Sequence, residues 1–78
     1  MHIIPKRLNI SMKRLKKGIS MRELARRAGL NIGTISNIES KNKNIAPKTA
    51  KLICDVLEAN FDDLFEIVES SAIEIEAN

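Results

Sequence analysis

The sequence is poor in the residue types on which most catalytic, redox and metal sites depend. Its 78 residues include one cysteine, one histidine, no tryptophan and no tyrosine. One cysteine excludes an internal disulfide framework, and no pair of Cys or His residues has zinc spacing. His2 has no acid or nucleophile arranged around it, and Cys54 falls on the apolar face of a predicted helix. We therefore expect a protein that is not an enzyme, with no catalytic residue, no metal and no cofactor.

Long apolar runs are also missing. No stretch approaches the roughly 20 residues that cross a bilayer, and the first residues, MHIIPKRL, lack the apolar region of a secretory signal. We expect a cytoplasmic protein with no membrane partner and no small-molecule ligand. A chain this short buries a modest fraction of its surface, so a second copy would help to stabilise it. We expect one domain over residues 1–78, with a core at about 6–69 and an acidic C-terminal segment, 70–78.

What the sequence does have is a strong segregation of charge. Residues 1–51 contain all 13 Lys and Arg and two acids, Glu23 and Glu39, for a net charge of +11. Residues 52–78 contain eight acids and no Lys or Arg, for a net charge of −8. Ordinary surface solvation accounts for many charges but not for such segregation. A basic half of this kind favours a protein that binds nucleic acid.

Apolar periodicity and helix-end signals predict five helices. The first runs from Lys6 or Asn9 to Lys17 and stops at Gly18. Its apolar stripe has the spacing i, i+4, i+7 and i+11, with Ile10 and Arg14 beside it. The residues of the stripe are Leu8, Met12, Leu15 and Ile19.

The second and third helices are joined by a tight turn. Ser20, with Glu23 three residues on, has the capping-box pattern at the start of the second helix, and Asn31 is placed to cap the third. Gly29 can take the positive φ that ends one helix and turns the chain toward the next. The residues expected to face inward are Leu24, Ala25, Leu30, Ile35 and Ile38.

The fourth and fifth helices follow a polar loop. Pro47 suits the first turn of the fourth helix, whose inner face holds Ala50, Ile53, Cys54 and Leu57. Asn60 is placed to cap the fifth helix, which has acids in its first turn where the helix dipole favours negative charge. Phe61, Phe65 and Val68 have helical spacing on this last helix. One or two of them should complete the core, and the rest should form a subunit contact.

Residues 20–39, SMRELARRAGLNIGTISNIE, resemble the helix-turn-helix of the phage-repressor-like Xre/Cro family. The matches are GIS at 18–20, ELA at 23–25, the turn glycine, TISNIE at 34–39 and VLEANFDDLF at 56–65. The resemblance as a whole runs from about Asn9 to Phe65, which is most of the chain. The resemblance implies an all-α, five-helix, repressor-like DNA-binding domain, in which helix 32–40 enters the major groove.

The family's base-facing positions fall on residues with suitable chemistry. Ile32 can pack on a thymine methyl group, and Asn37 can pair bidentately with adenine. Thr34 can make either kind of contact, and Gly33 would let the backbone come close to DNA. The alternative for these four residues is an ordinary solvated helix face.

Phosphate contacts are expected around the motif. The family commonly has a glutamine at the start of the second helix, but here the residue is Met21, which offers only its backbone N–H. The third helix also lacks Arg and Gln, which leaves room for methyl contacts, water or DNA deformability to carry part of the specificity. The expected phosphate-contacting residues are Met21, Arg22, Asn31, Ser36, Lys41 and Lys43. Solvated surface cations are the alternative for the charged members of this set.

Two further expectations concern structure. The resemblance places Arg14 opposite Glu39 as a partly buried ion pair that ties the first helix to the end of the third. Ile3 and Ile4 precede Pro5, while residues 72–76 read AIEIE with the period of a half-buried strand. We expect these ends to pair as a small antiparallel sheet near the dimer surface, away from DNA. The dimer candidates are Phe61, Phe65, Val68, Ile73 and Ile75.

The leading hypothesis is a sequence-specific DNA-binding transcriptional regulator. We expect a homodimeric repressor of the phage or mobile-element type, bound to a pseudo-palindromic operator in double-stranded DNA. One alternative is the antitoxin of a toxin–antitoxin pair, although nine residues at 70–78 are few for wrapping a toxin. Another is an interaction adaptor that does not contact DNA.

Overall fold

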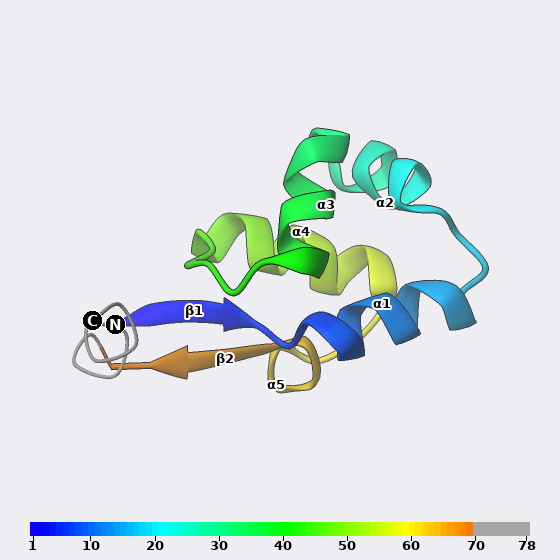
Figure 1. The fold of residues 1–78 in the computed structure, drawn as a ribbon. Coiled ribbons are helices and arrows are strands. Elements are labelled where there is room, and N and C mark those ends of the chain that lie inside the picture. The colour runs from blue at the N-terminus through cyan, green and yellow to red at the C-terminus, as the bar shows by residue number, and fades with distance from the viewer. Residues whose placement is uncertain (70–78) are drawn as a thin grey trace.

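Helices form the middle of the chain, and two short strands, one before the helices and one after them, lie side by side (Figure 1). The computed structural model describes residues 1–69. Figure 1 shows α2 and the start of α3 on one side of the domain and α5 with the sheet on the other. The five predicted helices and the small antiparallel sheet are confirmed. The elements are β1 (His2–Pro5), α1 (Arg7–Lys16), α2 (Met21–Ala28), α3 (Ile32–Ser40), α4 (Pro47–Leu57), α5 (Phe61–Leu64) and β2 (Phe65–Val68).

Local signals set the helix ends, with two differences from expectation. The Ser20 hydroxyl accepts a hydrogen bond from the Glu23 backbone N–H at 3.0 Å, as expected of an N-cap. The Glu23 carboxylate does not return to the cap, because it pairs with Arg26 and Arg27, so the capping box is half formed. Asn31 occupies the N-cap position of α3 but makes no side-chain capping bond.

The core joins all five helices. The predicted inner face of α4 is confirmed, and burial raises the pKa of the Cys54 thiol on it. The helix-turn-helix contributes its expected apolar residues, with Leu30 partly buried against the rest. No helix within residues 1–69 is long and apolar enough to cross a membrane. The core residues are Ile10, Ile19, Leu24, Ala25, Ile35, Ile38, Ala50, Ile53, Cys54, Leu57, Leu64 and Phe65.

The predicted apolar stripe is wrong in its orientation within α1, although its last residue, Ile19, is buried in the core. Leu8 is 71% exposed and Leu15 is 64% exposed, whereas Ile10 is fully buried. The helix is rotated so that Ile10 and Arg14, one turn apart, face the rest of the domain. Arg14 must reach Glu39 on α3, and that requirement turns the longer stripe outward.

The predicted C-terminal part of the fifth helix is also wrong, because α5 ends at Leu64 and the chain continues as β2. Phe65 is 1% exposed and belongs to the core, so it is not available for a subunit contact. A short apolar run fits helix and strand periods equally well, and the tertiary pairing decides between them. The Lys6 backbone N–H donates to the Leu64 carbonyl at 2.8 Å, next to the first residue pair of the sheet, Pro5 and Phe65.

The sheet forms from a different segment than expected. β1 pairs antiparallel with β2, with His2 opposite Val68 and Pro5 opposite Phe65. On its second edge, β1 is covered by the loop before α4, because Ile3 bonds the Asn44 side chain and the Ile45 backbone. The strand expected at 72–76 lies outside the described residues.

Substitutions at two positions of β2, Phe65 and Ile67, should differ sharply in their effect on the free energy of unfolding. Phe65→Ala should reduce the free energy of unfolding by about 3 to 5 kcal/mol, because it opens a cavity in the core. Ile67→Ala should change it by less than about 0.5 kcal/mol, since Ile67 is 57% exposed. Urea denaturation measures both. Equal losses would contradict the packing described here, in which Phe65 is buried in the core and Ile67 is exposed.

Candidate nucleic-acid interface

The turn between α2 and α3 sets the angle at which α3 leaves the domain. Gly29 has φ +70°, the left-handed conformation expected there. The Leu30 N–H bonds the Ala25 carbonyl at 2.8 Å, and the Gly29 N–H bonds the Arg26 carbonyl at 3.3 Å. These two bonds form a Schellman motif that ends α2. Ala25 is 3% exposed, and its small side chain lets the two helices approach closely.

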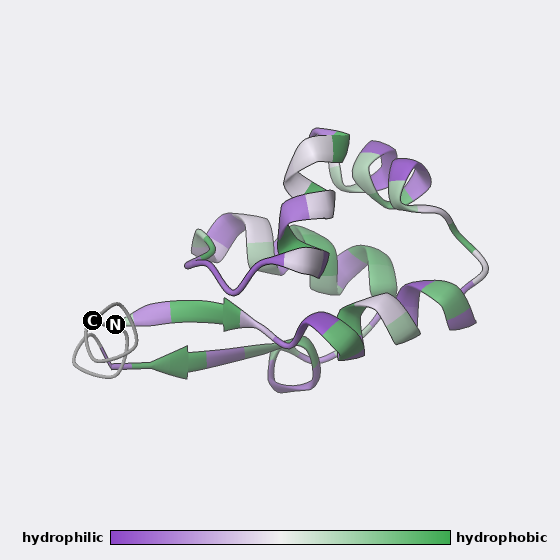
Figure 2. Cartoon of the chain, viewed as in Figure 1, coloured by the Kyte–Doolittle hydropathy of each residue, from purple (hydrophilic) through white to green (hydrophobic). Residues whose placement is uncertain are grey.

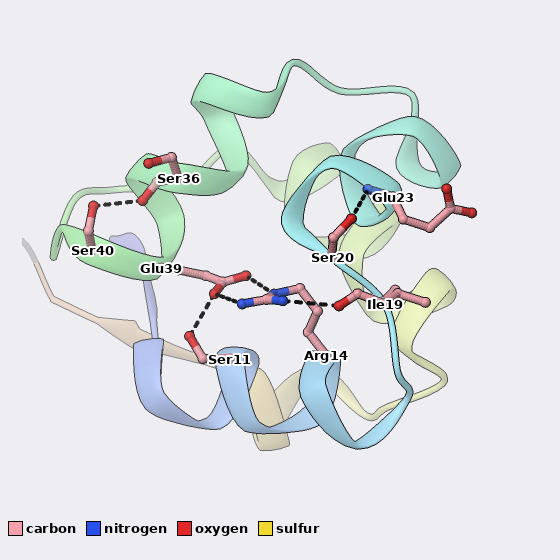
Figure 3. Close-up of polar contacts among 8 residues, drawn as sticks. All are labelled: Ser11, Arg14, Ile19, Ser20, Glu23, Ser36, Glu39 and Ser40. Atoms are coloured by element: carbon pink, nitrogen blue, oxygen red, sulfur yellow. Dashed lines mark hydrogen bonds and ion pairs between the residues drawn. The ribbon is translucent and has the colours of Figure 1, made fainter.

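An ion pair holds the other end of α3 (Figure 3). Arg14 donates from Nε to Glu39 Oε2 at 2.8 Å and from Nη2 to Oε1 at 3.0 Å. It also donates to the Ile19 carbonyl, while the Ser11 hydroxyl donates to Glu39 Oε1 at 2.7 Å. The hydrogen bond to Glu39 raises the pKa of Arg14 above its ordinary value. The network therefore joins α1, the following turn and α3 through two charged side chains that are 11% and 7% exposed.

A second contact from α1 reaches the C-terminus of α3. The Arg7 guanidinium donates to the Ser40 carbonyl at 3.0 Å, where the helix dipole favours a cation. Neither Arg7 nor Ser11 was among the residues singled out from the sequence. Both contacts join residues about 30 positions apart, for which no local pattern gives a signal.

One face of α3 is open to solvent. Ile32 is 44% exposed, and Gly33, Ser36 and Asn37 are also exposed. Thr34 lies at the border of this face and is half-buried. A Cβ added at Gly33 would meet no atom within 4 Å, so packing does not require glycine there. None of these side chains makes a hydrogen bond within residues 1–69, which leaves Ser36 and Asn37 free to bind a partner.

The flanks of this face are polar or basic. Arg22, Lys41 and Lys43 are exposed, and the structure gives them no ion pair within residues 1–69. Met21 is partly buried against the core, which leaves its backbone as the group it can offer. Arg26 and Arg27 bond the Glu23 carboxylate and lower its pKa to about 2. The cations that remain unpaired around α3 suit an anionic ligand.

The sequence profile of the helix-turn-helix family matches residues 10–64, which is more than half of the chain. The chain belongs to the helix-turn-helix family. This membership makes it, by class, a DNA-binding transcription regulator. Comparison with curated proteins gives no significant match.

Two solved structures share the architecture of this helix-turn-helix domain. The clp gene regulator ClgR from C. glutamicum is 27% identical, with a TM-score of 0.63 over 70% of this chain and 71% of that one. The hypothetical transcription factor NHTF from Neisseria is 24% identical, with a TM-score of 0.65 over 96% of this chain and 92% of that one. The second likeness therefore includes the parts of the fold beyond the matched family region.

The site residues expected from the sequence fall into two groups in the helix-turn-helix domain. Ile32, Gly33, Ser36 and Asn37 lie on the open face of α3, with Thr34 at its edge. Ser36 was expected at a phosphate, but it lies centrally on this face, one turn from Ile32. Their contacts with DNA stay predictions. The expected flanking residues are spread over the start of α2 and the two ends of α3: Met21, Arg22, Asn31, Lys41 and Lys43.

Breaking one side of the α1–α3 ion pair should destabilise the helix-turn-helix domain more than removing both. Glu39→Met should cost about 3 to 5 kcal/mol in the free energy of unfolding, because it leaves the Arg14 charge buried and unpaired. Arg14→Met with Glu39→Met should recover most of that loss. Removing the exposed Lys17–Glu58 pair, as a matched control, should cost at most about 1 kcal/mol. A double variant as unstable as Glu39→Met alone, in urea denaturation, would contradict this account.

Proposed function

We propose that the protein is a sequence-specific transcription regulator that inserts α3 into the major groove of double-stranded DNA. The observation that carries the proposal is the open face of α3, whose polar side chains have no partner within residues 1–69. This face lies in the half of the chain that carries a net charge of +11. The similar structure from C. glutamicum is a regulator of clp genes, which supports the same class of activity.

Base recognition is assigned to the open face. Asn37 is an exposed amide that can donate and accept at one adenine edge, which makes it the strongest candidate for direct readout. Ile32 offers an apolar contact to a thymine methyl group, and Thr34 offers a hydroxyl or a methyl group. Gly33 brings backbone toward DNA, because no side chain stands between it and solvent. α3 has one charged residue, Glu39, and Arg14 pairs with it, so the recognition surface itself is neutral.

Phosphate contacts are assigned to the flanks. Lys41 and Lys43 follow α3 directly, and Arg22 lies in the first turn of α2. The backbone N–H groups at the start of α2, including that of Met21, point to a site that suits a phosphate oxygen. Asn31 at the start of α3 adds a neutral donor. These groups fix the position of the domain on the duplex, and they contribute affinity that falls with salt.

A homodimeric repressor on a pseudo-palindromic operator is the form of regulator that we propose. One short helix reads few base pairs, and a two-fold dimer doubles the site. The sheet and α5 lie away from α2 and the start of α3 (Figure 1), which suits a subunit contact on that side. Phe61 is partly buried and stacks on Phe65 with ring centres 5.6 Å apart, so Phe61 and Val68 are the described candidates that remain. Ile73 and Ile75 lie outside the described residues.

Loss of the Asn37 side chain should weaken binding to the cognate site selectively. Asn37→Ala should cost about 1 to 3 kcal/mol on the selected sequence and little on random duplex, because a bidentate base contact is lost. Fluorescence anisotropy, on a site selected from a random DNA library, measures both affinities. Asn42→Ala, an exposed asparagine beyond α3, is the matched control and should leave both unchanged. An equal loss on both duplexes would show that Asn37 reads no base.

The lysines after α3 should act on all sequences alike. Lys41→Ala with Lys43→Ala should weaken cognate and random binding together and lower the slope of log K against log salt by about 0.9 per lost phosphate contact. Lys51→Ala removes an exposed cation from α4 and serves as the control. An unchanged slope would place the two lysines outside the interface, and absence of any binding at low salt would support the adaptor hypothesis instead.

A further inference from the structure

One face of α1 carries a row of large apolar side chains that nothing within residues 1–69 covers. Leu8 is 71% exposed, Met12 45% and Leu15 64%. Their spacing of i, i+4 and i+7 puts them side by side on the helix. Figure 2 shows how apolar residues recur along α1, much as they do along the core helix α4. Single exposed apolar residues are ordinary, but a contiguous row marks an interaction surface.

The domain cannot bury this row by rotating α1. Ile10, on the inner side of the helix, is fully buried, and Arg14 is held by its bonds to Glu39 and to the Ile19 carbonyl. Turning Leu8 and the rest of the row inward would break that ion pair and expose Ile10. The occupant of the row therefore has to come from elsewhere.

Charge restricts what the occupant can be. The α1 sequence, RLNISMKRLK, contains no acid. Lys13 and Lys16 lie on one side of the row, so a second α1 packed against it would bring like charges together. The groove beside Met12 is lined by Lys13 and Lys16 from α1 and by Asp62 and Asp63 from α5, so the carboxylates of an acidic occupant must lie toward the lysines. An apolar segment with acidic side chains fits this surface best.

The chain itself contains such a segment. Residues 70–78, SSAIEIEAN, have Ile73 and Ile75 alternating with Glu74 and Glu76, and they include no Lys or Arg. Alternation presents the two isoleucines on one side and the two carboxylates on the other when the segment is extended. Its isoleucines match the leucines of α1, and its carboxylates match the flanking lysines.

We propose that the Leu8–Met12–Leu15 face of α1 binds residues 70–78 of a second copy of this chain. Figure 1 shows β2 and α1 running in opposite directions from the place where Pro5 meets Phe65. Ile75 of the same copy reaches at most about 25 Å from Val68 when fully extended. The distance from Val68 to Leu15 of the same copy, followed back along the sheet and then along α1, is about as long, at roughly 3.3 Å per strand residue and 1.5 Å per helix residue. The chain would also have to reverse direction after Val68, and no length remains for that turn. The segment that reaches Leu15 therefore comes from the second copy.

Reciprocal binding of this kind closes a two-fold dimer. Each copy gives one segment and receives one on its α1, so both contacts are the same. The inference rests on the homodimer of the proposed function and names its surface. It is measured without DNA, so failure to bind an operator and failure to dimerise through α1 are separate results.

Mixing two complementary variants of the full chain tests the exchange. Leu8→Gln with Leu15→Gln makes the α1 face polar, and Ile73→Gln with Ile75→Gln removes the apolar side chains of segment 70–78. Each variant alone should dimerise about tenfold or more weakly than the unmodified chain in sedimentation velocity. An equimolar mixture should regain part of the dimer, because one of its two contacts joins the intact segment of the first variant to the intact α1 of the second. Lys51→Gln, which changes an exposed residue of α4, is the control and should leave dimerisation unchanged.

Each other outcome overturns the proposal. A segment variant that dimerises normally indicates α1 packing on α1, and variants that weaken without recovery in the mixture indicate no exchange of segments. If the unmodified chain is a monomer at micromolar concentration, the α1 face does not bind a second copy. As an independent check, Lys13→Glu with Lys16→Glu should weaken the dimer, and adding Glu74→Lys with Glu76→Lys should restore it. Circular dichroism, which should be the same for every variant because the residues changed in α1 are exposed, confirms that each one folds.

Discussion

The bidentate pairing of Arg14 with Glu39 is the interaction on which the arrangement of this domain depends. It joins the first helix to the last turn of α3 across 25 residues of sequence, and Ser11 and the Ile19 carbonyl complete its hydrogen bonds. Both side chains are nearly buried, so the pair has few alternative geometries. Its net contribution to stability is modest because burying two charges is costly. The effect of the pair on geometry is larger, because it fixes the rotation of α1 and the position of the last turn of α3 against α1.

Both exposed surfaces of the domain follow from that constraint. With Glu39 turned toward α1, the opposite face of α3 is left with neutral side chains that have no hydrogen-bond partner within residues 1–69. With Arg14 turned toward α3, the row that begins at Leu8 faces solvent. One interaction thus separates a polar surface suited to base edges from an apolar surface suited to a protein segment. The two surfaces lie on different helices, α3 and α1, so the two proposed contacts use different residues.

The division of charge along the chain supports the same separation. The basic half contains α1, α2 and α3, and the acidic half contains most of α4, with α5, β2 and residues 70–78. A DNA-binding side assembled from the basic half attracts phosphate. The acidic half is repelled by phosphate. Segregated charge therefore favours a fixed orientation of the domain on DNA.

Much of this structure could be predicted from the sequence, because its signals are local. Ser20, Gly29 and Pro47 determine helix ends through backbone groups only a few residues away. The inner face of α4 follows from the helical spacing of its apolar residues, which are the residues that the domain buries. The α1 stripe and the end of α5 could not be obtained in this way. The rotation of α1 was decided by Glu39, 25 residues away from Arg14, and the strand at Phe65 by pairing with β1 at the other end of the chain. A periodic pattern shows that a helix has an apolar face, but long-range contacts decide which face the domain buries.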